Sequence, residues 1–399
     1  MAKNSMKPQI RFKGFTDAWE QRKLGEYFEE RNERSGEGEL ISVTINSGIK
    51  KFNELGRFDS KPEDLSKYKR VEVGDIAYNS MRMWQGASGY SPYAGILSPA
   101  YTVITPKNGI SSLFFAYLIK RPLMIHLFEI NSQGLTSDTW NLKFPAFSRI
   151  EASAPFSVKE QDRIAELFTI LDNLITLHQR KYEKLVNIKK SMLDKMFPKN
   201  GASVPEIRFK GFTDPWEQRK LGEIAVFSKG VGYSKNDLCE EGTPIILYGR
   251  LYTKYETCIF DVDTFVKEKA GGVYSKGGEV IVPASGETAE DISIASVVVK
   301  PGILLGGDLN IVSPTAEYDS AFLALTISSG ATHKYLSSLA QGKSVVHLHN
   351  ADIQSVSAKF PTKREQEKIH LLFGKIDTLI TLHQRKLEKL VQIRKAFAE

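Results

Sequence analysis

Long apolar runs are absent from this 399-residue sequence. No stretch approaches the ~18 consecutive apolar residues of a membrane-spanning helix. The opening residues, Met1–Ser5, contain no apolar segment either, so a secretory signal is not expected. Only two cysteines occur, Cys239 and Cys258, and their spacing matches neither a zinc site nor a redox motif. The sequence therefore predicts a protein of a reducing, cytoplasmic compartment.

Catalytic signatures are also missing. The absence of Pro-Pro excludes an amino-methyltransferase motif of the Asn-Pro-Pro-Tyr type, and the absence of Pro-Asp excludes the usual nuclease carboxylate signature. No phosphate-binding loop or dinucleotide fingerprint occurs, and Gly230-Val231-Gly232 is interpreted as a turn. His347 and His349 share one face of an extended segment, but no third metal ligand is evident. We predict no catalytic residue, metal site or cofactor in this chain, which favours a binding module over an enzyme.

The composition is that of a globular protein with more than one core. Hydrophobic residues make up 41% of the chain and charged residues 25%, which excludes wholesale disorder. At roughly 100–200 residues per domain, the length suggests two to four domains. The net charge of +7 is compatible with an anionic partner such as nucleic acid, but charge alone does not decide this.

An internal duplication organises the chain. Residues 10–26 and 207–223 share the sequence IRFKGFTD-x-WEQRKLGE and differ only at Ala18 and Pro215. A second repeat, at an offset of 205, aligns residues 160–192 with 365–397 and has 20 identities in 33 positions. The segments between the first and second repeat of each unit differ in sequence, but both contain short β-branched runs that end in Gly, Pro or Asn. The repeats predict two units of like plan with different loops.

The second repeat predicts a long helix in each unit. Ser157-x-x-Glu160 and Thr362-x-x-Glu365 have the pattern of capping boxes, which mark helix starts. Apolar residues then alternate at spacings of four and three, which is typical of a coiled-coil seam. An amphipathic helix lying on its own domain is the alternative. The predicted seam consists of Ile164, Phe168, Leu171, Ile175, His178, Tyr182 and Leu185 in the first helix, and of Ile369, Phe373, Ile376, Ile380, His383, Leu387 and Leu390 in the second.

Connectivity predicts the direction of the two helices. The second unit begins just after the first helix ends, so the second helix can pair with the first only by running back. We expect antiparallel helices of about 35 residues, or roughly 50 Å, which suits two domains held about one DNA turn apart. His178 and His383 would lie near the middle, either as a polar pair that fixes the register or as half-solvated residues without a role.

Polar loops next to predicted strands are candidates for DNA contacts. Residues 79–85 read Asn-Ser-Met-Arg-Met-Trp-Gln, and Arg, Asn and Gln are side chains that read base edges. Residues 284–290 form the equivalent segment of the second unit. A structural role is the open alternative for each residue, with Trp84 in a core or Arg82 paired with an acid. The candidates are Asn79, Arg82, Gln85, Thr136, Ser137, Arg250, Ser285, Thr288, Lys343 and Ser344.

These features together resemble the specificity subunits of type I restriction–modification systems. The carriers are the repeated opening, the E-Q-x-x-I helix starts, the Leu-His-Gln-Arg-Lys blocks at 177–181 and 382–386, and Lys-Met-Phe-Pro at 195–198. The resemblance covers essentially the whole chain. It implies two target-recognition domains that each bind half of a split, asymmetric site on double-stranded DNA. It also implies two methylation subunits that carry S-adenosylmethionine and restriction subunits that use ATP and Mg.

We therefore predict an α+β fold with two pseudo-repeated α/β target-recognition domains joined by two long antiparallel coiled-coil helices. The two alternatives are a self-contained DNA-modifying enzyme and a coiled-coil scaffold that binds no nucleic acid. The expected boundaries are an N-terminal tail at 1–9, the first recognition domain at 10–156, the first helix at 157–197, a linker at 198–206, the second recognition domain at 207–361 and the second helix at 362–399.

Overall fold

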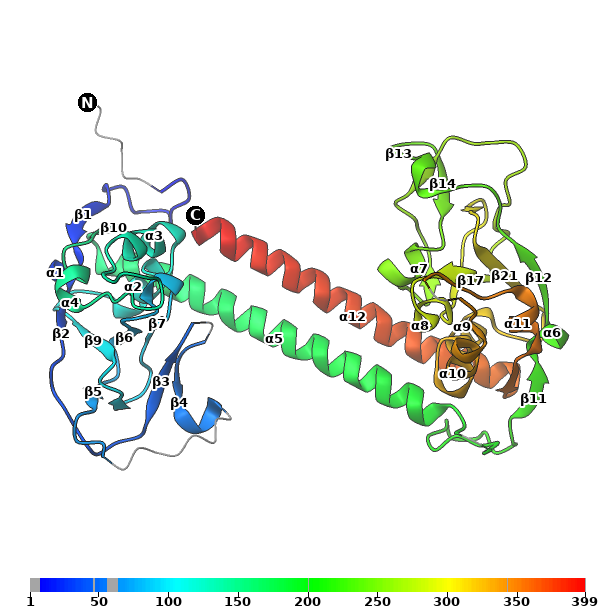
Figure 1. Ribbon diagram of the computed structural model, residues 1–399, viewed down its shortest axis with the longest axis horizontal. Helices are drawn as coiled ribbons and strands as arrows, with labels where there is room; N and C mark the ends of the chain where they lie inside the picture. Colours follow the sequence, from blue (N-terminus) through cyan, green and yellow to red (C-terminus); the bar gives the residue numbers. More distant parts are fainter. Residues whose placement is uncertain (1–7, 46, 56–63, 200, 343, 399) are drawn as a thin grey trace. The chain divides into compact units, whose positions relative to one another are not determined.

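The computed structural model describes residues 8–45, 47–55, 64–199, 201–342 and 344–398. The chain divides into two compact units (Figure 1). Unit 1 contains the chain up to His178 together with the segment from Lys386 onward, and unit 2 runs from Gln179 to Arg385. Each unit therefore combines one globular α/β part with portions of both long helices. Within the described residues, no helix is both long and apolar enough to span a membrane.

The core of unit 1 lies between a mixed set of short helices and an antiparallel sheet of order β2-β9-β6-β7. Buried aromatic side chains, among them Phe28, Tyr78, Phe115 and Phe128, fill the space between them. Two smaller sheets pair β3 with β4 and β5 with β8. The elements are β1 (Glu20–Lys23), α1 (Leu24–Tyr27), β2 (Phe28–Glu30), β3 (Ile41–Thr44), β4 (Gly48–Lys51), β5 (Lys69–Val71), β6 (Ile76–Asn79), η2 (Met83–Gln85), β7 (Ser88–Tyr90), β8 (Gly95–Leu97), β9 (Tyr101–Pro106), α2 (Ser112–Leu118), α3 (Pro122–Ile130), α4 (Phe144–Phe147) and β10 (Glu151–Ala154).

Unit 2 repeats this plan with a larger sheet of order β12-β21-β17-β19-β15. The central strand β17 is buried along its whole length, and it is apolar except for Glu279 at its start. Helix α9 packs on this sheet and is apolar on all sides because all sides are covered. The elements are β11 (Glu217–Lys220), α6 (Leu221–Ile224), β12 (Ala225–Lys229), β13 (Leu238–Cys239), β14 (Thr243–Ile246), α7 (Arg250–Thr253), β15 (Cys258–Ile259), β16 (Phe265–Val266), β17 (Glu279–Pro283), β18 (Ser285–Gly286), α8 (Ala289–Ile292), β19 (Ser296–Val298), β20 (Leu304–Leu305), β21 (Leu309–Pro314), α9 (Ser320–Ile327), α10 (Gly330–Leu339), β22 (Val346–His347), α11 (Asn350–Ser355) and β23 (Ser357–Phe360).

The repeated opening folds in the same way in both units. Its Glu-Gln-Arg-Lys segment forms β1 in unit 1, which pairs antiparallel with β10, the strand that leads into the first long helix. In unit 2 the same four residues form β11 and pair in the same manner with β23, just before the second long helix. The near-identity of the repeats therefore reflects one joint that is built twice, between the start of a globular part and the helix that leaves it.

A buried ion pair, which we call the clamp, closes each joint. In unit 1, Arg11 donates from Nε and Nη2 to the two carboxylate oxygens of Glu160, over 2.6 and 2.7 Å. In unit 2, Arg208 donates to Glu365 in the same bidentate way, over 2.8 Å for both bonds. The exposed fractions of the Glu160 and Glu365 side chains are only 1% and 0%. In each unit the clamp therefore links the repeated opening to the start of the long helix.

Both long helices begin where the capping boxes predict. The prediction that Glu160 and Glu365 cap these helices is wrong, because both carboxylates bind arginines instead. Both carboxylate oxygens of Glu160 are bound by Arg11, so this side chain serves the clamp and not the helix N-cap. The neighbouring Gln161 is also used structurally, because its amide accepts from the backbone N–H of Ser111 and donates to the carbonyl of Pro155. Gln366 repeats these two bonds in unit 2. The Glu-Gln pair is therefore a joint between helix and domain.

The long helices are α5 (Val158–Met196) and α12 (Lys363–Ala398). The predicted seam residues are all buried or half-buried, including His178 and His383, whose roles stay predictions. Flanking apolar residues such as Leu174 and Leu382 are more exposed. The seam thus marks the face of each helix that is covered by protein.

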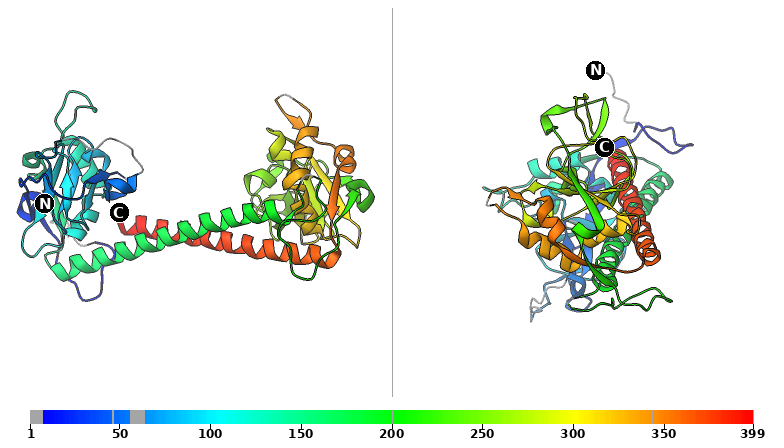
Figure 2. Two further views of the ribbon diagram at one scale, coloured as in Figure 1. Left: turned by 90° about the horizontal axis from the view of Figure 1, so that it is seen from below. Right: turned by 90° about the vertical axis from the view of Figure 1, so that its right-hand side faces the viewer.

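Each unit contains an ion pair that fixes the register of α5 against α12. In unit 1, where the last turns of α12 lie beside the first half of α5 (Figure 2), Arg394 donates to Asp172 over 2.5 Å. In unit 2, Lys189 donates to Asp377 over 2.5 Å. Asp377 lies 205 positions after Asp172, and Arg394 lies 205 positions after Lys189, so both pairs follow the repeat. The predicted antiparallel direction is confirmed within each unit.

Candidate nucleic-acid interface

Two loops of unit 1 carry the sequence-predicted DNA contacts, and the structure brings them together. The first is residues 79–87, which begin at the last residue of β6 and include η2. The second is residues 131–142, whose ends are closed by two hydrogen bonds between Gln133 and Asn141, of 3.1 and 2.8 Å. The backbone N–H of Leu142 donates to the carbonyl of Ser80 over 2.8 Å and so ties one loop to the other. We call these segments the loop pair of unit 1.

Aromatic packing stiffens the loop pair of unit 1. The rings of Trp84 and Trp140, one from each loop, meet edge to face at 5.3 Å between centroids. The indole N–H of Trp84 donates to the backbone carbonyl of Met81. The backbone N–H of Met81 in turn donates to the side-chain carbonyl of Asn79. Trp84 is half-buried and packs within the loop pair, so its predicted alternative as part of a core does not apply. These contacts hold a polar surface rigidly on the end of the sheet.

The predicted contact residues of unit 1 lie on this surface. Gln85, Thr136 and Ser137 are exposed, while Asn79 and Arg82 are half-buried. Arg82 forms neither an ion pair nor a side-chain hydrogen bond with the described residues, unlike the arginines of the clamps. Its guanidinium is therefore available for a ligand. Whether these residues read bases stays a prediction.

Unit 2 has an equivalent loop pair, built from residues 284–290 and 341–349. The N–H of Leu348 donates to the carbonyl of Ala284 over 3.0 Å, as Leu142 does to Ser80 in unit 1. Gln341 and His347 exchange two hydrogen bonds, of 3.0 and 2.8 Å, as Gln133 and Asn141 do. The two units thus present loops of the same topology with different side chains.

The Gln-Gly step that recurs in the two loops has a steric cause. Gly134 and Gly342 both have positive φ values, of 156° and 139°. A Cβ at Gly134 would lie 2.6 Å from the carbonyl oxygen of Thr139, and one at Gly342 would lie 2.0 Å from that of Val345. Only glycine lets the chain cross itself at this point. The backbone of each loop therefore requires glycine at this position.

Two predicted contact residues of unit 2 are corrected by their surroundings. Ser285 is buried, because it lies in β18, which pairs with β22. The Arg250 side chain is only 8% exposed, and its guanidinium donates to Glu256 over 2.9 Å and to Asp263 over 2.5 Å. Hydrogen bonds from Lys254 and Arg250 lower the pKa of the Asp263 carboxyl to about 2, so these ion pairs persist at neutral pH. Neither side chain is free to reach a base edge.

The remaining candidates of unit 2 are more mixed. Thr288 is exposed, but its hydroxyl oxygen caps α8 by accepting from the N–H of Asp291. Ser344 is exposed on the loop pair. Lys343 lies outside the described residues. The exposure of Ser344 is therefore compatible with its predicted DNA contact. Thr288 is exposed as well, although its hydroxyl oxygen is already used as the cap of α8.

Sequence reasoning missed three aromatic or imidazole side chains on the loop pairs. Trp140 was not singled out, although it is a large apolar residue in a polar segment that contains glycine. His347 and His349 were weighed only as metal ligands. They are exposed and their rings lie parallel, with centroids 6.4 Å apart. These three rings are therefore further side chains of the loop pairs, beside the predicted polar contacts.

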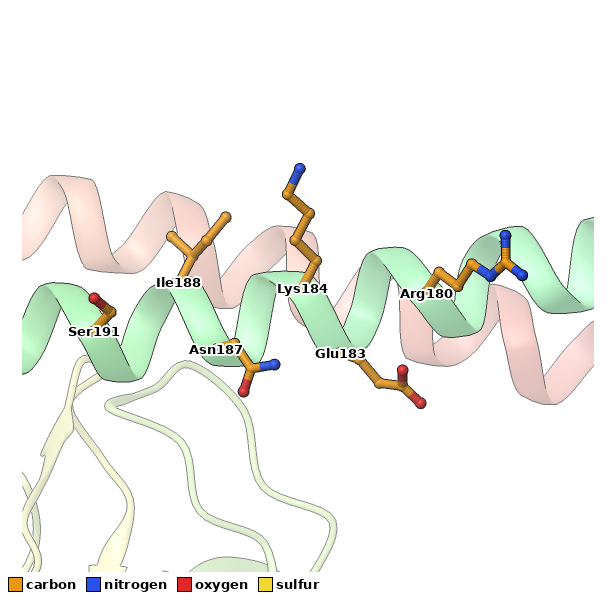
Figure 3. A pocket seen from close by; sticks show the side chains of 6 residues that line it. All are labelled: Arg180, Glu183, Lys184, Asn187, Ile188 and Ser191. Carbon is orange, nitrogen blue, oxygen red and sulfur yellow. The ribbon is translucent and has the colours of Figure 1, made fainter. Parts of the chain in front are cut away.

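A shallow groove along α5 in unit 2 is a weaker candidate. It is lined by Arg180, Glu183, Lys184, Asn187, Ile188 and Ser191 (Figure 3). The labelled side chains point in diverging directions, so their polar groups do not converge on one ligand. This surface lacks the geometry of a binding site for a small molecule.

Comparisons with known proteins agree with this picture. The model of the type I restriction modification DNA specificity domain matches residues 16–187 and 213–392. The MjaVIII specificity subunit of a type I restriction enzyme of Methanocaldococcus jannaschii is 22% identical over 83% of this chain and 80% of its own length. The putative MjaX specificity subunit of the same organism is 22% identical, over 84% and 79%. A crystal structure of the type I S subunit from M. genitalium matches with a TM-score of 0.58 and 15% identity, covering 98% of both chains, which shows a shared fold.

Proposed function

Because this chain belongs to the type I restriction–modification DNA specificity family, we propose that it is the specificity subunit of such a complex. In this role it recognises a split, asymmetric DNA sequence, with one half-site for each unit. The observation that carries the proposal is the loop pair, which occurs in both units with the same backbone hydrogen bonds and different side chains. Equivalent loops with different chemistry suit two different half-sites.

We propose that the chain supplies specificity only, inside the cytoplasm, and that the chemistry belongs to its partners. Methylation subunits would bring S-adenosylmethionine for adenine methylation, and restriction subunits would bring ATP and Mg. The sequence supports this division, because it lacks the motifs of a methyltransferase, a nuclease or a phosphate-binding loop. The self-contained enzyme and the scaffold without nucleic acid remain the competing functions.

Exposed leucines on the long helices support two equivalent partner sites. In unit 1, Leu174 and Leu177 on α5 are 36% and 45% exposed, and their repeat counterparts on α12 in unit 2, Leu379 and Leu382, are both 44% exposed. The same apolar positions are thus uncovered in each unit. We propose that one methylation subunit docks on each unit through these side chains.

The isolated chain should neither methylate nor cut DNA, and with its methylation partner it should confer site-specific methylation. The test is the transfer of a radiolabelled methyl group to DNA by the stringently purified chain, by the partner alone and by the mixture. A salt-dependent shift of labelled DNA with the mixture separates the proposal from the scaffold alternative. Turnover by the chain alone would favour the self-contained enzyme.

Exchange of residues 27–156 for the corresponding segment of a relative should change one half-sequence and leave the other intact. The reason is that β1 and the clamp, which join this segment to α5, belong to the shared repeats and lie outside it. Mapping of methylated adenines in a host that carries the chimera reads both half-sequences at once. A change in both halves would contradict recognition by separate units.

Replacement of Arg82 by alanine should reduce discrimination at one half-site by about 1–3 kcal/mol if the guanidinium reads a guanine edge. The unpaired state of Arg82 among the described residues motivates the choice. Competition binding with single-base variants of the site measures the effect. If Arg82 contacts phosphate, affinity falls for all sequences and the salt slope shrinks by about one.

Arg70→Ala is the matched control for Arg82→Ala. Arg70 lies in the same unit, but its guanidinium is engaged by Glu33 and Glu72. Its loss should leave the sequence preference unchanged. A loss of thermal stability in Arg82→Ala without any change in DNA binding would assign Arg82 a structural role.

A further inference from the structure

Buried polar side chains lie beneath both loop pairs, where each sheet meets its loops. In unit 1 they belong to Ser80 and Thr102, which are only 5% and 4% exposed, and in unit 2 to Asn310, which is fully buried. Side chains so deeply buried cannot touch a ligand on the surface of the loops. Any effect that they have on a ligand must therefore pass through the loop residues that they hold.

In unit 1 the buried side chains join the sheet to the loops. A hydrogen bond of 2.8 Å links the hydroxyl oxygens of Ser80, in the first loop, and Thr102, in β9. The backbone carbonyl of Ser80 also accepts from the N–H of Leu142, which is the bond that ties the two loops together. The bond to Thr102 thus fastens the sheet to the residue at which the two loops meet.

Unit 2 has a bond of the same kind from a different side chain. The side-chain N–H of Asn310, in β21, donates to the backbone carbonyl of Leu348 over 2.8 Å. Leu348 is fully buried, and its own N–H donates to the carbonyl of Ala284 and so ties the loops of this unit. Here too, the sheet is fastened to the junction of the loop pair.

Strand register shows that Thr102 and Asn310 are counterparts. Thr102 pairs with the residue of β6 two positions before Ser80, and Asn310 pairs with the residue of β17 two positions before Ala284. The side chains at these positions differ in a coordinated way. The Ser80 hydroxyl is within reach of a short threonine. Ala284 has no polar side-chain atom, and the longer asparagine bonds to the Leu348 carbonyl instead.

The amide of Asn310 is only half used. Its side-chain oxygen is buried and accepts no hydrogen bond from the residues that the structure describes. A buried polar atom without a partner is costly, so packing alone does not favour asparagine here. The bond from its N–H group to Leu348 is therefore what this side chain contributes at its position.

We propose that Thr102 and Asn310 are positioning residues for sequence recognition, and that each fixes the loop pair of its own unit against the sheet. The inference rests on the proposed function, because it takes the loop pairs as the surfaces that read the half-sites. Discrimination between bases requires side chains held at hydrogen-bonding distance and angle. A loop pair that shifts on its sheet accepts a wrong base more readily.

Loss of either bond should relax one half-site and leave the other unchanged. Thr102→Val removes the hydroxyl but nearly keeps the shape, and Asn310→Thr is too short to reach Leu348. Genome-wide mapping of methylated adenines, with the methylation partner present, gives the ratio of methylation at the correct site to that at sites with one wrong base. We expect this ratio to fall about fivefold or more in the affected half. The exchange of residues 27–156 assigns the two halves to the units.

Two restoring variants separate positioning from a general loss of stability. Thr102→Ser keeps the hydroxyl and should retain discrimination. Ala284→Ser combined with Asn310→Thr copies the Ser80–Thr102 pair into unit 2, and it should recover the discrimination that Asn310→Thr loses. The control is Val280→Ala, in buried β17 four residues before the loop. It should lower the melting temperature without relaxing either half-site. If Thr102→Val does not fold, Ser80→Ala removes the same bond from the loop side and takes its place.

Three results would overturn the proposal. One is unchanged discrimination in both single variants, and another is relaxation by Val280→Ala that equals the effect of Asn310→Thr on its half-site. The third is a copied pair in unit 2 that restores nothing. The wild-type chain, mapped in the same host, distinguishes these results from failure of the proposed function. Absence of site-specific methylation by the wild type with its partner would reject that function, and this inference with it.

Discussion

Glu365→Ala should lower the free energy of unfolding of unit 2 by about 3–5 kcal/mol, because it leaves Arg208 buried without its counter-charge. The Glu365 side chain is fully buried and accepts both hydrogen bonds of the Arg208 guanidinium, whose side chain is only 11% exposed. Differential scanning calorimetry measures the loss as a lower melting temperature of unit 2. The transition of unit 1, which has its own clamp, is the internal reference.

A surface ion pair in the same unit provides the matched control. Glu217 and Arg219 pair at 2.6 Å, but their side chains are 70% and 49% exposed. Since exposed pairs contribute about 0–1 kcal/mol, Glu217→Ala should barely move the transition. If both variants shifted it equally, burial of the clamp would not be the cause of its effect.

Removing both partners of the clamp should cost less than removing one. In Arg208→Met combined with Glu365→Leu, no charge is left buried, so we expect recovery of much of the stability lost in Glu365→Ala. Glu160→Ala should repeat the single-variant effect in unit 1, where the indole N–H of Trp19 also approaches the carboxylate at 3.4 Å. A double variant as unstable as Glu365→Ala would show that the clamp stabilises through its hydrogen-bond geometry and not through charge pairing.

The repeats made the large features of the fold predictable. Helices expected at 157–197 and 362–399 are found at Val158–Met196 and Lys363–Ala398, because amphipathic spacing over so many residues leaves little ambiguity. Local detail was less predictable. The chain turns at Gly74, with φ of 99°, between β5 and β6. Buried Asp75 in that turn accepts from Arg31, a partner 44 residues away that no local pattern reveals.

The roles of individual polar residues depended on distant partners and could not be predicted. Glu160 has the spacing of a capping residue, yet its carboxylate binds Arg11, 149 positions earlier. Arg250 reads as an exposed loop arginine, but Asp263 and Glu256 fold back onto it. By contrast, Gln85 and Thr136 are exposed as expected, because both lie in loops and loops run over the surface of a protein.

Insertion of one heptad into each long helix, after Lys184 and after Lys389, should lengthen the gap between the half-sites by up to about 3 base pairs. Seven residues add about 10 Å of helix, and DNA rises about 3.4 Å per base pair. The half-sequences should not change, because the loop pairs are untouched. Affinity is expected to fall, since a longer gap also turns one half-site around the duplex. Genome-wide mapping of methylated adenines reads the gap directly.

The register pairs explain why both helices must be lengthened together. Asp172 binds Arg394 in unit 1, and Lys189 binds Asp377 in unit 2. A heptad in each helix adds the same length to α5 and to α12 between the two ion pairs. Both ion pairs and the seam can therefore re-form. A heptad in one helix alone leaves one of the two pairs out of register by about 10 Å of helix. That single-insertion variant is the matched control, and it should lose site-specific methylation that the double insertion retains. An active double-insertion variant with an unaltered gap would mean that the helices do not set the spacing between half-sites.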